Sequence, residues 1–339
     1  MSAEPVLSLA TPDRGGPAQP LLSVTGLRKH FALPGGWLRR QRSKVRAVDG
    51  LSFTVAKGET LGVVGESGCG KSTMARLVAR LIEPDAGELV FDGESVGTRT
   101  GLALKDFRRN LQMVFQDSHG SLNPRMPVGQ AVAYGPRVHG MAAVAARHRA
   151  HDLLDRVGLA SDVFAQRYPH ELSGGQRQRV NIARALAFEP RLLILDESVA
   201  ALDKSVQAQV LNLLQELKAE RHLTYLFISH DLQVVHYLAD RVMVMYLGIV
   251  VETGPVEPLY RAPRHPYTKA LLSAVPSLDP ARRTQQSPLA GDPPNPVNPP
   301  SGCRFRDRCP LAQARCAAEV PALRETTPGH WAACHFDQA

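Results

Sequence analysis

Four short runs of mostly apolar residues recur along the chain, and each ends at small or polar residues. They span residues 60–64, 111–115, 192–195 and 225–229. Continuous apolar runs of this length are typical of strands that are buried on both faces of a parallel sheet. The pattern therefore predicts a parallel sheet at the centre of the fold.

Other stretches are predicted to cover or extend this sheet. Residues 73–81, 142–157 and 178–187 are expected to be helical. Residues 21–53 and 87–92 are expected to supply edge strands of a smaller antiparallel sheet. The elements together indicate an α/β protein with a separate helical part.

A glycine-rich loop joins the first apolar run to the first predicted helix. It reads Gly65-Glu66-Ser67-Gly68-Cys69-Gly70-Lys71-Ser72, is followed by Thr73, and fits the pattern G-x-x-x-x-G-K-[ST]. Glycines let backbone N–H groups turn toward phosphate oxygens, and the helix N-terminus adds positive potential. We expect Lys71 to reach the β- and γ-phosphates and Ser72 to hold Mg²⁺. The loop predicts a P-loop NTPase core of the RecA-like type.

The third apolar run ends in two carboxylates, Asp196 and Glu197. Active groups of parallel sheets lie at the carboxyl ends of the strands. We expect Asp196 to help hold Mg²⁺, through water, and Glu197 to polarise the attacking water. Solvated charges at a strand end are the simpler alternative, and the preceding phosphate loop disfavours it.

Further polar residues follow the remaining runs. Gln116 ends the second run, His230 follows the fourth, and the glycine-rich stretch Leu172-Ser173-Gly174-Gly175-Gln176 lies between them. Each alone could be an ordinary structural residue. Their order along the chain, after a phosphate loop, favours a shared functional role instead.

With these five motifs the chain resembles the ATP-binding cassette (ABC) family over residues 21–258. The resemblance implies that Gln116 senses Mg²⁺ and the membrane subunits and that His230 contacts the γ-phosphate. It also implies that Phe31 stacks on adenine, although residues 33–46 look like an insertion that moves it upstream. It further implies a signature of Ser173, Gly174, Gly175 and Gln176 that completes the ATP site of a partner subunit, and a D-loop ending at Asp203.

The chain departs from the family pattern at a few positions. Ser198 and Ser118 stand where relatives usually have proline, and Ala200 or Ala201 stands where many have serine. None of these changes removes a ligand of phosphate, metal or water. Hydrolysis of ATP is therefore expected.

The last eighty residues narrow the resemblance. Residues 265–272, a proline-rich stretch at 287–301, and the motifs around Cys303, Cys309 and Cys334 resemble the C-terminal extension of oligopeptide/dipeptide importer ATPases. The N-terminal half is similar to the F-type of their two ATPase subunits. The resemblance implies a second, non-identical ATPase subunit, two transmembrane permeases and an extracytoplasmic solute-binding protein as partners.

The four cysteines of this region, Cys303, Cys309, Cys316 and Cys334, suggest a metal site. Disulfides are disfavoured in the cytosol, and zinc sites usually contain close C-x₂₋₄-C pairs, which this spacing lacks. Four thiolates also suit an iron–sulfur cluster. The resemblance favours a [4Fe–4S] cluster, with zinc or free thiols as alternatives.

Bulk properties bound the function. The chain has 339 residues, 44% of them hydrophobic, and a net charge of +8. It contains no run of about 18 apolar residues. We expect a protein on the cytoplasmic face of the cell membrane, attached through its partners. The charge is dispersed, so nucleic acid is not an expected partner, and the basic cluster at 39–46 is expected to be a solvated loop rather than a lipid contact.

The predicted organisation is a disordered tail at residues 1–20, a nucleotide-binding domain at 21–258 and a C-terminal extension at 259–339. A helical subdomain is expected at about 117–177. The predicted function is the ATP-hydrolysing subunit of a di- or oligopeptide importer. The alternatives are an importer of another solute, such as nickel, a glutathione-like peptide or a sugar, and a soluble ABC ATPase without a transport role.

Overall fold

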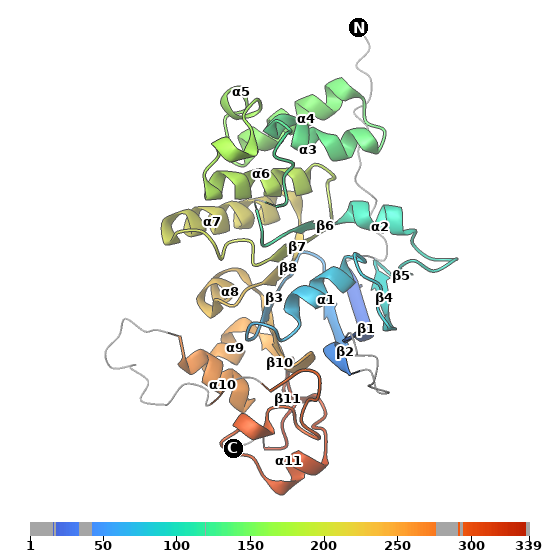
Figure 1. The fold of residues 1–339 in the computed structure, drawn as a ribbon, viewed down its shortest axis with the longest axis vertical. Helices are drawn as coiled ribbons and strands as arrows, with labels where there is room; N and C mark the ends of the chain where they lie inside the picture. The colour runs from blue at the N-terminus through green and yellow to red at the C-terminus, as the bar shows by residue number, and fades with distance from the viewer. Residues whose placement is uncertain are drawn as a thin grey trace. The chain divides into compact units, whose positions relative to one another are not determined.

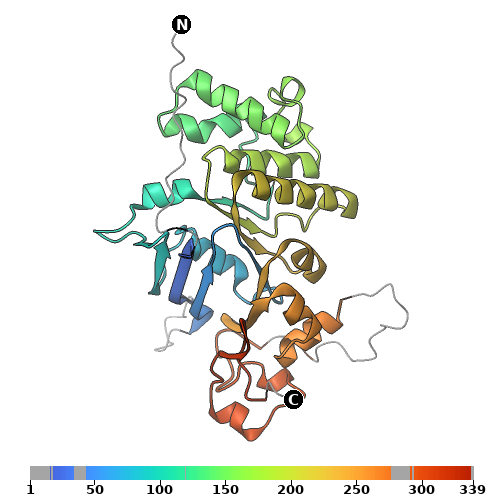
Figure 2. The ribbon, with the colours of Figure 1, turned by 180° about the vertical axis from the view of Figure 1, so that it is seen from behind.

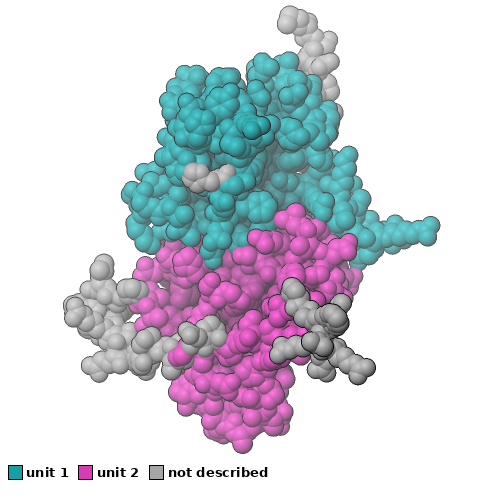
Figure 3. Space-filling model, viewed as in Figure 1, with its two compact units in different colours: residues 1–21, 56–58, 91–226 teal, residues 22–55, 59–90, 227–339 magenta. Residues whose placement is uncertain are grey.

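The computed structural model describes Gly16, Gly291 and residues 18–33, 43–118, 120–275 and 294–336. Most of the predicted N-terminal tail lies outside these ranges, as does half of the basic cluster at 39–46. The chain forms two compact units that alternate along the sequence (Figure 3). Unit 1 contains residues 1–21, 56–58 and 91–226, and unit 2 contains residues 22–55, 59–90 and 227–339.

Unit 2 contains the strand that precedes the phosphate loop. Strand β3 (Thr60–Val64) is buried at every position and pairs in parallel with β9 (Arg241–Tyr246). Strand β10 (Ile249–Pro255) continues antiparallel to β9, followed by β12 (His330–Ala332) and β11 (Arg324–Thr327). The order is therefore β11-β12-β10-β9-β3, so the end of the chain extends the same sheet as the phosphate-loop strand.

Short helices surround these strands (Figure 1). Helix α1 (Lys71–Val78) begins at the lysine of the phosphate loop and stops two residues before Arg80, which has a φ of +53°. The predicted end at residue 81 was therefore too late, because a left-handed residue cannot continue the helix. The other helices of unit 2 are α8 (Leu232–Leu238), α9 (Val256–Arg261), α10 (Pro266–Ser273) and α11 (Ala314–Ala318), with a 3₁₀ turn at Arg306–Arg308.

The predicted antiparallel sheet is also present. Strands β1 (Leu22–Ala32) and β2 (Lys44–Val55) are antiparallel partners, and β4 (Ala86–Phe91) lies on the other side of β1. Gly87 allows this close pairing, because a Cβ atom there would lie 2.6 Å from the Cα atom of Leu27. Strand β4 ends in unit 1, where the short β5 (Glu94–Ser95) follows.

Unit 1 combines three strands with a group of helices. Strands β6 (Leu111–Val114) and β7 (Leu192–Asp196) are parallel, and β8 (Thr224–Ile228) lies beside β7 and ends in unit 2. Helices α3, α4 and α6 contact one another, and both ribbon views show α3 to α6 grouped at one end of this unit (Figure 2). The helices are α2 (Leu104–Asn110), α3 (Val128–Val138), α4 (Ala143–Arg156), α5 (Ser161–Phe164), α6 (Gly174–Leu186) and α7 (Lys204–Arg221), with a 3₁₀ turn at Pro169–Glu171.

Within the ranges that the structure describes, no helix is long and apolar enough to cross a membrane.

Candidate functional site

The phosphate loop in unit 2 needs its glycines. Gly65 and Gly70 have φ values of +151° and +108°. A Cβ atom at Gly65 would lie 2.3 Å from the carbonyl oxygen of Met245, and one at Gly70 would lie 2.2 Å from that of Ala47. Only glycine fits such contacts. The loop is thus held close to the backbone of two neighbouring strands.

Lys71 lies over this loop with 4% of its surface exposed. Its Nζ donates hydrogen bonds to the carbonyl oxygens of Gly65, at 2.7 Å, and Glu66, at 3.1 Å. Lys71 also begins α1, so Ser72 and Thr73 occupy the first turn, and the N-terminus of a helix favours an anion. The ammonium group, the loop and the helix N-terminus therefore create positive potential in one place.

His230 lies on the same side of unit 2 as this loop. It follows β8, and the N–H of the preceding Ser229 donates to the carbonyl oxygen of Val63, at 3.2 Å. Val63 is two residues before Gly65, so His230 is located where β3 ends and the loop begins. Asp231 then caps α8, accepting a hydrogen bond from the N–H of Gln233 at 3.0 Å.

Phe31 lies on β1 opposite Val45, and 40% of its surface is exposed. The Nζ of Lys29 lies 5.8 Å from the centre of its ring. An exposed ring is compatible with the predicted stacking on adenine, which stays a prediction.

Unit 1 joins two of the predicted catalytic residues. Strands β6 and β7 are parallel, so Gln116 and Glu197 follow strand ends at the same edge. The Gln116 Nε2 donates a hydrogen bond to the Glu197 Oε2 at 2.8 Å. Glu197 has a φ of +46°, which is uncommon outside glycine and is found at functional sites. Asp196, which ends β7, is 3% exposed.

The glycine-rich signature stretch forms the start of α6. Ser173 is the N-cap, and its Oγ accepts a hydrogen bond from the N–H of Gln176 at 3.3 Å. The Gln176 side chain in turn accepts a hydrogen bond from the N–H of Ser173 at 2.9 Å, which completes a capping box. The predicted helix at 178–187 thus begins earlier, at Gly174. This places the signature at a helix N-terminus, which suits an anion.

The D-loop lies beside the signature in unit 1. Asp203 caps α7, accepting a hydrogen bond from the N–H of Val206 at 2.9 Å. This bond lowers the pKa of Asp203. A Cβ atom at Gly175 would lie 2.3 Å from the Cγ1 of Val206, so the signature helix packs directly against the start of α7.

The four C-terminal cysteines gather in unit 2 without forming a metal site. The N–H of Cys303 donates to the carbonyl oxygen of Cys316 at 2.7 Å. Burial raises the pKa of the Cys303 thiol to about 11, and the charges of the other three thiols add to the effect. In the part of the chain that the structure describes, no three His, Cys, Asp or Glu side chains are arranged to hold a metal ion. The donor set fits a thiolate-bound metal, and the arrangement is not preformed.

Sequence reasoning missed three residues that contact the phosphate loop or its neighbours. Tyr267 accepts a hydrogen bond at its hydroxyl oxygen from the N–H of Glu66, at 2.8 Å. Arg308 forms an ion pair with the Glu66 carboxylate. Arg304 donates to the Leu247 carbonyl oxygen and pairs with Asp49. These residues belong to motifs that pointed only to the family, because sequence alone does not show contacts across two hundred residues.

Comparison with known proteins matches these features. The family model described as "ABC transporter" matches residues 48–200, and the one described as "Oligopeptide/dipeptide transporter, C-terminal region" matches residues 251–316. The chain is 48% identical to the oligopeptide transport ATP-binding protein AppF of Bacillus subtilis over 320 residues, 93% of this chain and 97% of that protein. It is 51% identical to a provisionally named peptide import ATP-binding protein of Brucella ovis over 319 residues, 94% of this chain and 98% of that protein.

Solved structures agree with the family models. The chain is similar to cbiO1 from Clostridium perfringens, part of an ABC transporter complex, with a TM-score of 0.61 and 28% identity over 71% of this chain and 91% of the other. A dimeric ATP-binding cassette bound to ADP and Pi gives a TM-score of 0.60 at 28% identity, over 70% of this chain and 99% of the other. The chain therefore belongs to the ABC transporter family, as one of its ATPase subunits. Within that family it carries the C-terminal region typical of oligopeptide/dipeptide transporters.

Proposed function

We propose that the protein hydrolyses ATP to drive the import of di- or oligopeptides through a membrane complex. The observation that carries the proposal is the phosphate loop, whose glycines, lysine and helix N-terminus gather positive potential at one place. In this proposal Lys71 binds the β- and γ-phosphates and Ser72 holds Mg²⁺. The remaining loop residues supply backbone N–H groups, and Phe31 stacks on adenine.

Hydrolysis requires a positioned water. We propose that Glu197 polarises this water, with Gln116 and Asp196 acting toward Mg²⁺ and His230 toward the γ-phosphate. The hydrogen bond from Gln116 orients the Glu197 carboxylate and links the sensing residue to the water-polarising one. When bound, Mg²⁺ neutralises charge that develops on the phosphate oxygens.

The signature residues serve a second subunit in this proposal. Ser173, Gly174, Gly175 and Gln176 contact the γ-phosphate held by the partner's phosphate loop, and Asp203 supports them from the start of α7. The partner is a second, non-identical ATPase of the same complex. Two permeases and an extracytoplasmic solute-binding protein complete it, and the ATPase is peripheral to the membrane. The names of the peptide-import relatives support the choice of solute.

A paired substitution tests the catalytic assignment. Glu197→Gln is expected to bind ATP as the wild type does and to lower ATP turnover in the assembled complex by at least about a hundredfold. Glu216→Gln is the matched control, since Glu216 undergoes the same chemical change on an exposed face of α7 in the same unit. Turnover at the wild-type rate in the Glu197 variant would remove Glu197 from the mechanism.

Purification of the intact complex tests the transport assignment. Two permeases and a second ATPase are expected to co-purify with this chain, and the solute-binding subunit is expected to bind short peptides. Binding of a metal or sugar instead of peptides would transfer the protein to another importer class. Recovery of the chain alone from gently solubilised membranes would contradict the transport role.

The cysteines carry a separate proposal. We propose that Cys303, Cys309, Cys316 and Cys334 bind a [4Fe–4S] cluster, with a structural role because ATP hydrolysis needs no redox step. Their mutual proximity supports the proposal. Anaerobically purified protein is expected to contain about four irons per chain and a broad visible absorption. One zinc per chain would assign a zinc site to these cysteines instead. Four reactive thiols without metal would mean that they bind no metal.

A further inference from the structure

A part-buried ion pair links the C-terminal region to the phosphate loop. Arg308 donates two hydrogen bonds to the Glu66 carboxylate, from Nη1 at 2.7 Å and from Nη2 at 3.0 Å. Only 5% of the Arg308 side chain and 24% of the Glu66 side chain is exposed. A bidentate pair that is screened this little by water is among the stronger electrostatic contacts in proteins.

Aromatic packing fixes the position of the backbone that carries Arg308. Arg308 ends the 3₁₀ turn that follows Phe305, and its N–H donates to the Phe305 carbonyl oxygen at 3.0 Å. Phe305 is 1% exposed, and its ring lies 5.4 Å from the rings of both Tyr246 and Tyr267. The guanidinium is therefore presented to the loop by a rigid, buried support.

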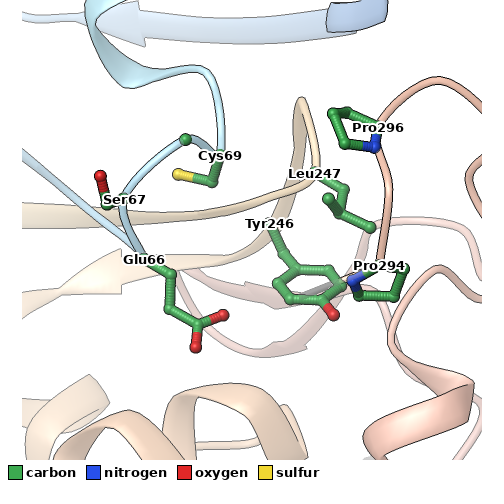
Figure 4. A pocket seen from close by; sticks show the side chains of 8 residues that line it. Glu66, Ser67, Cys69, Tyr246, Leu247, Pro294 and Pro296 are labelled. Atoms are coloured by element: carbon green, nitrogen blue, oxygen red, sulfur yellow. The ribbon is translucent and has the colours of Figure 1, made fainter. Parts of the chain in front are cut away.

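The neighbouring stretch of the C-terminal region covers the same side of the loop. Pro294 and Pro296 lie across a cavity of about 160 Å³ from the loop residues Ser67 and Cys69 (Figure 4). The carbonyl oxygen of Pro296 accepts a hydrogen bond from the N–H of Arg46, at 3.1 Å. The C-terminal region thus borders the loop at several points, and Arg308 supplies the charge.

Two hydrogen bonds hold the backbone of Glu66, and neither involves its side chain. Its N–H donates to the Tyr267 hydroxyl, and its carbonyl oxygen accepts from the Lys71 ammonium. Loss of the ion pair would therefore leave the loop conformation supported. It would also leave a bare carboxylate on the loop that has to receive a polyanion, and like charges at this range repel.

We propose that Arg308 is a positioning residue of the ATP site that acts through Glu66. It neutralises the one carboxylate of the phosphate loop and thereby raises the affinity for nucleoside triphosphate. The inference rests on the proposed function, because it takes the loop to be the phosphate site. It assigns to the C-terminal region a role in nucleotide affinity that is independent of any metal the cysteines bind.

Calorimetric titration of the full chain with Mg²⁺ and a non-hydrolysable ATP analogue tests this role. Arg308→Ala is expected to weaken binding by about tenfold, since it exposes the triphosphate to an unpaired charge. Arg308→Lys keeps the charge and is expected to stay within about threefold of the wild type. Arg261→Ala is the matched control, because it removes the same charge from an exposed pair with Glu257 in the same unit.

A double variant separates charge from structure. If Arg308 acts by neutralising Glu66, then Glu66→Gln combined with Arg308→Ala restores affinity to within about threefold of the wild type. A structural role predicts instead that the double variant binds as weakly as Arg308→Ala. Adenosine, which carries no phosphate, is expected to bind all variants equally. In the assembled complex the loss is expected in KM for ATP, with kcat within about twofold.

Failure of the Arg308 proposal can be told apart from failure of the proposed ATPase function. A wild-type chain that binds no nucleotide would remove the phosphate site itself. Wild-type affinity in Arg308→Ala, or a double variant that is not restored, would overturn the role of Arg308 and leave the ATPase assignment intact. If Arg308→Ala alone fails to fold, the double variant decides: near-wild-type affinity supports the role of Arg308, and weak binding by the folded double variant overturns it.

Discussion

His265 should make the stability of the protein depend on pH. Its ring is 1% exposed, lies 5.6 Å from the ring of Phe305, and caps α10 by accepting a hydrogen bond from the N–H of Tyr267 at 3.1 Å. Burial lowers its pKa from 6.5 to about 4, although the nearby Glu252 carboxylate opposes the shift. The folded protein therefore keeps this ring neutral at a pH at which the unfolded chain protonates it.

The sign and size of this pH dependence follow from the difference in the pKa of His265 between the folded and unfolded states. Because the pKa is lower in the folded state, stability is complete above pH 6.5 and is lost as the pH falls toward 4. Between pH 7 and pH 5 the loss from this one group is about 2 kcal/mol in the free energy of unfolding. His265→Asn keeps a capping acceptor without a titrating ring, so it removes this pH dependence and adds a constant loss from the smaller side chain.

Urea unfolding of both proteins at pH 5, 6 and 7 measures the difference. The wild type is expected to lose about 2 kcal/mol more than the variant over this range. Titrating groups far from His265 are common to both proteins and cancel in the comparison. Equal losses in the two proteins would refute the reasoning, because they would mean that His265 titrates normally when folded.

Three further substitutions follow from single contacts. Gly70→Ala places a methyl group against the Ala47 carbonyl oxygen at a left-handed φ, so it is expected to abolish binding of an ATP analogue in calorimetry. Tyr225→Phe removes the hydrogen bond that its hydroxyl donates to the Leu214 carbonyl oxygen at 2.9 Å, and a loss of about 1–2 kcal/mol is expected in urea unfolding. Ser173→Ala removes the N-cap of α6 and is expected to cost about 1 kcal/mol by the same measurement, whereas Ser173→Asn, which keeps a cap, is expected to cost little.

Sequence predicted the elements that are dominated by local pattern. The apolar runs at 60–64, 192–195 and 225–229 correspond to β3, β7 and β8. These strands are buried at every position, as a continuous apolar run indicates. The start of α6 was placed too late, although Ser173 and Gln176 have the spacing of a capping box and could have marked it.

Contacts between segments far apart in the chain could not be predicted from the sequence. The hydrogen bond from Gln116 to Glu197 spans 81 residues, and the ion pair of Arg308 with Glu66 spans 242. Neither leaves a local signal, because each depends on how strands and loops are arranged in space. The motif residues could therefore be named from sequence, and their partners could not.

The pairing of β12 with β10 has a consequence for handling this protein. Residues Glu252 and Thr253 of β10 pair with Ala332 and Trp331 at the far end of the chain. A shortened chain that ends at the predicted domain boundary, residue 258, would lose β11 and β12 and leave the backbone of β10 open along one side. Unpaired strand edges recruit other chains, so such a truncation would favour aggregation over a soluble nucleotide-binding fragment.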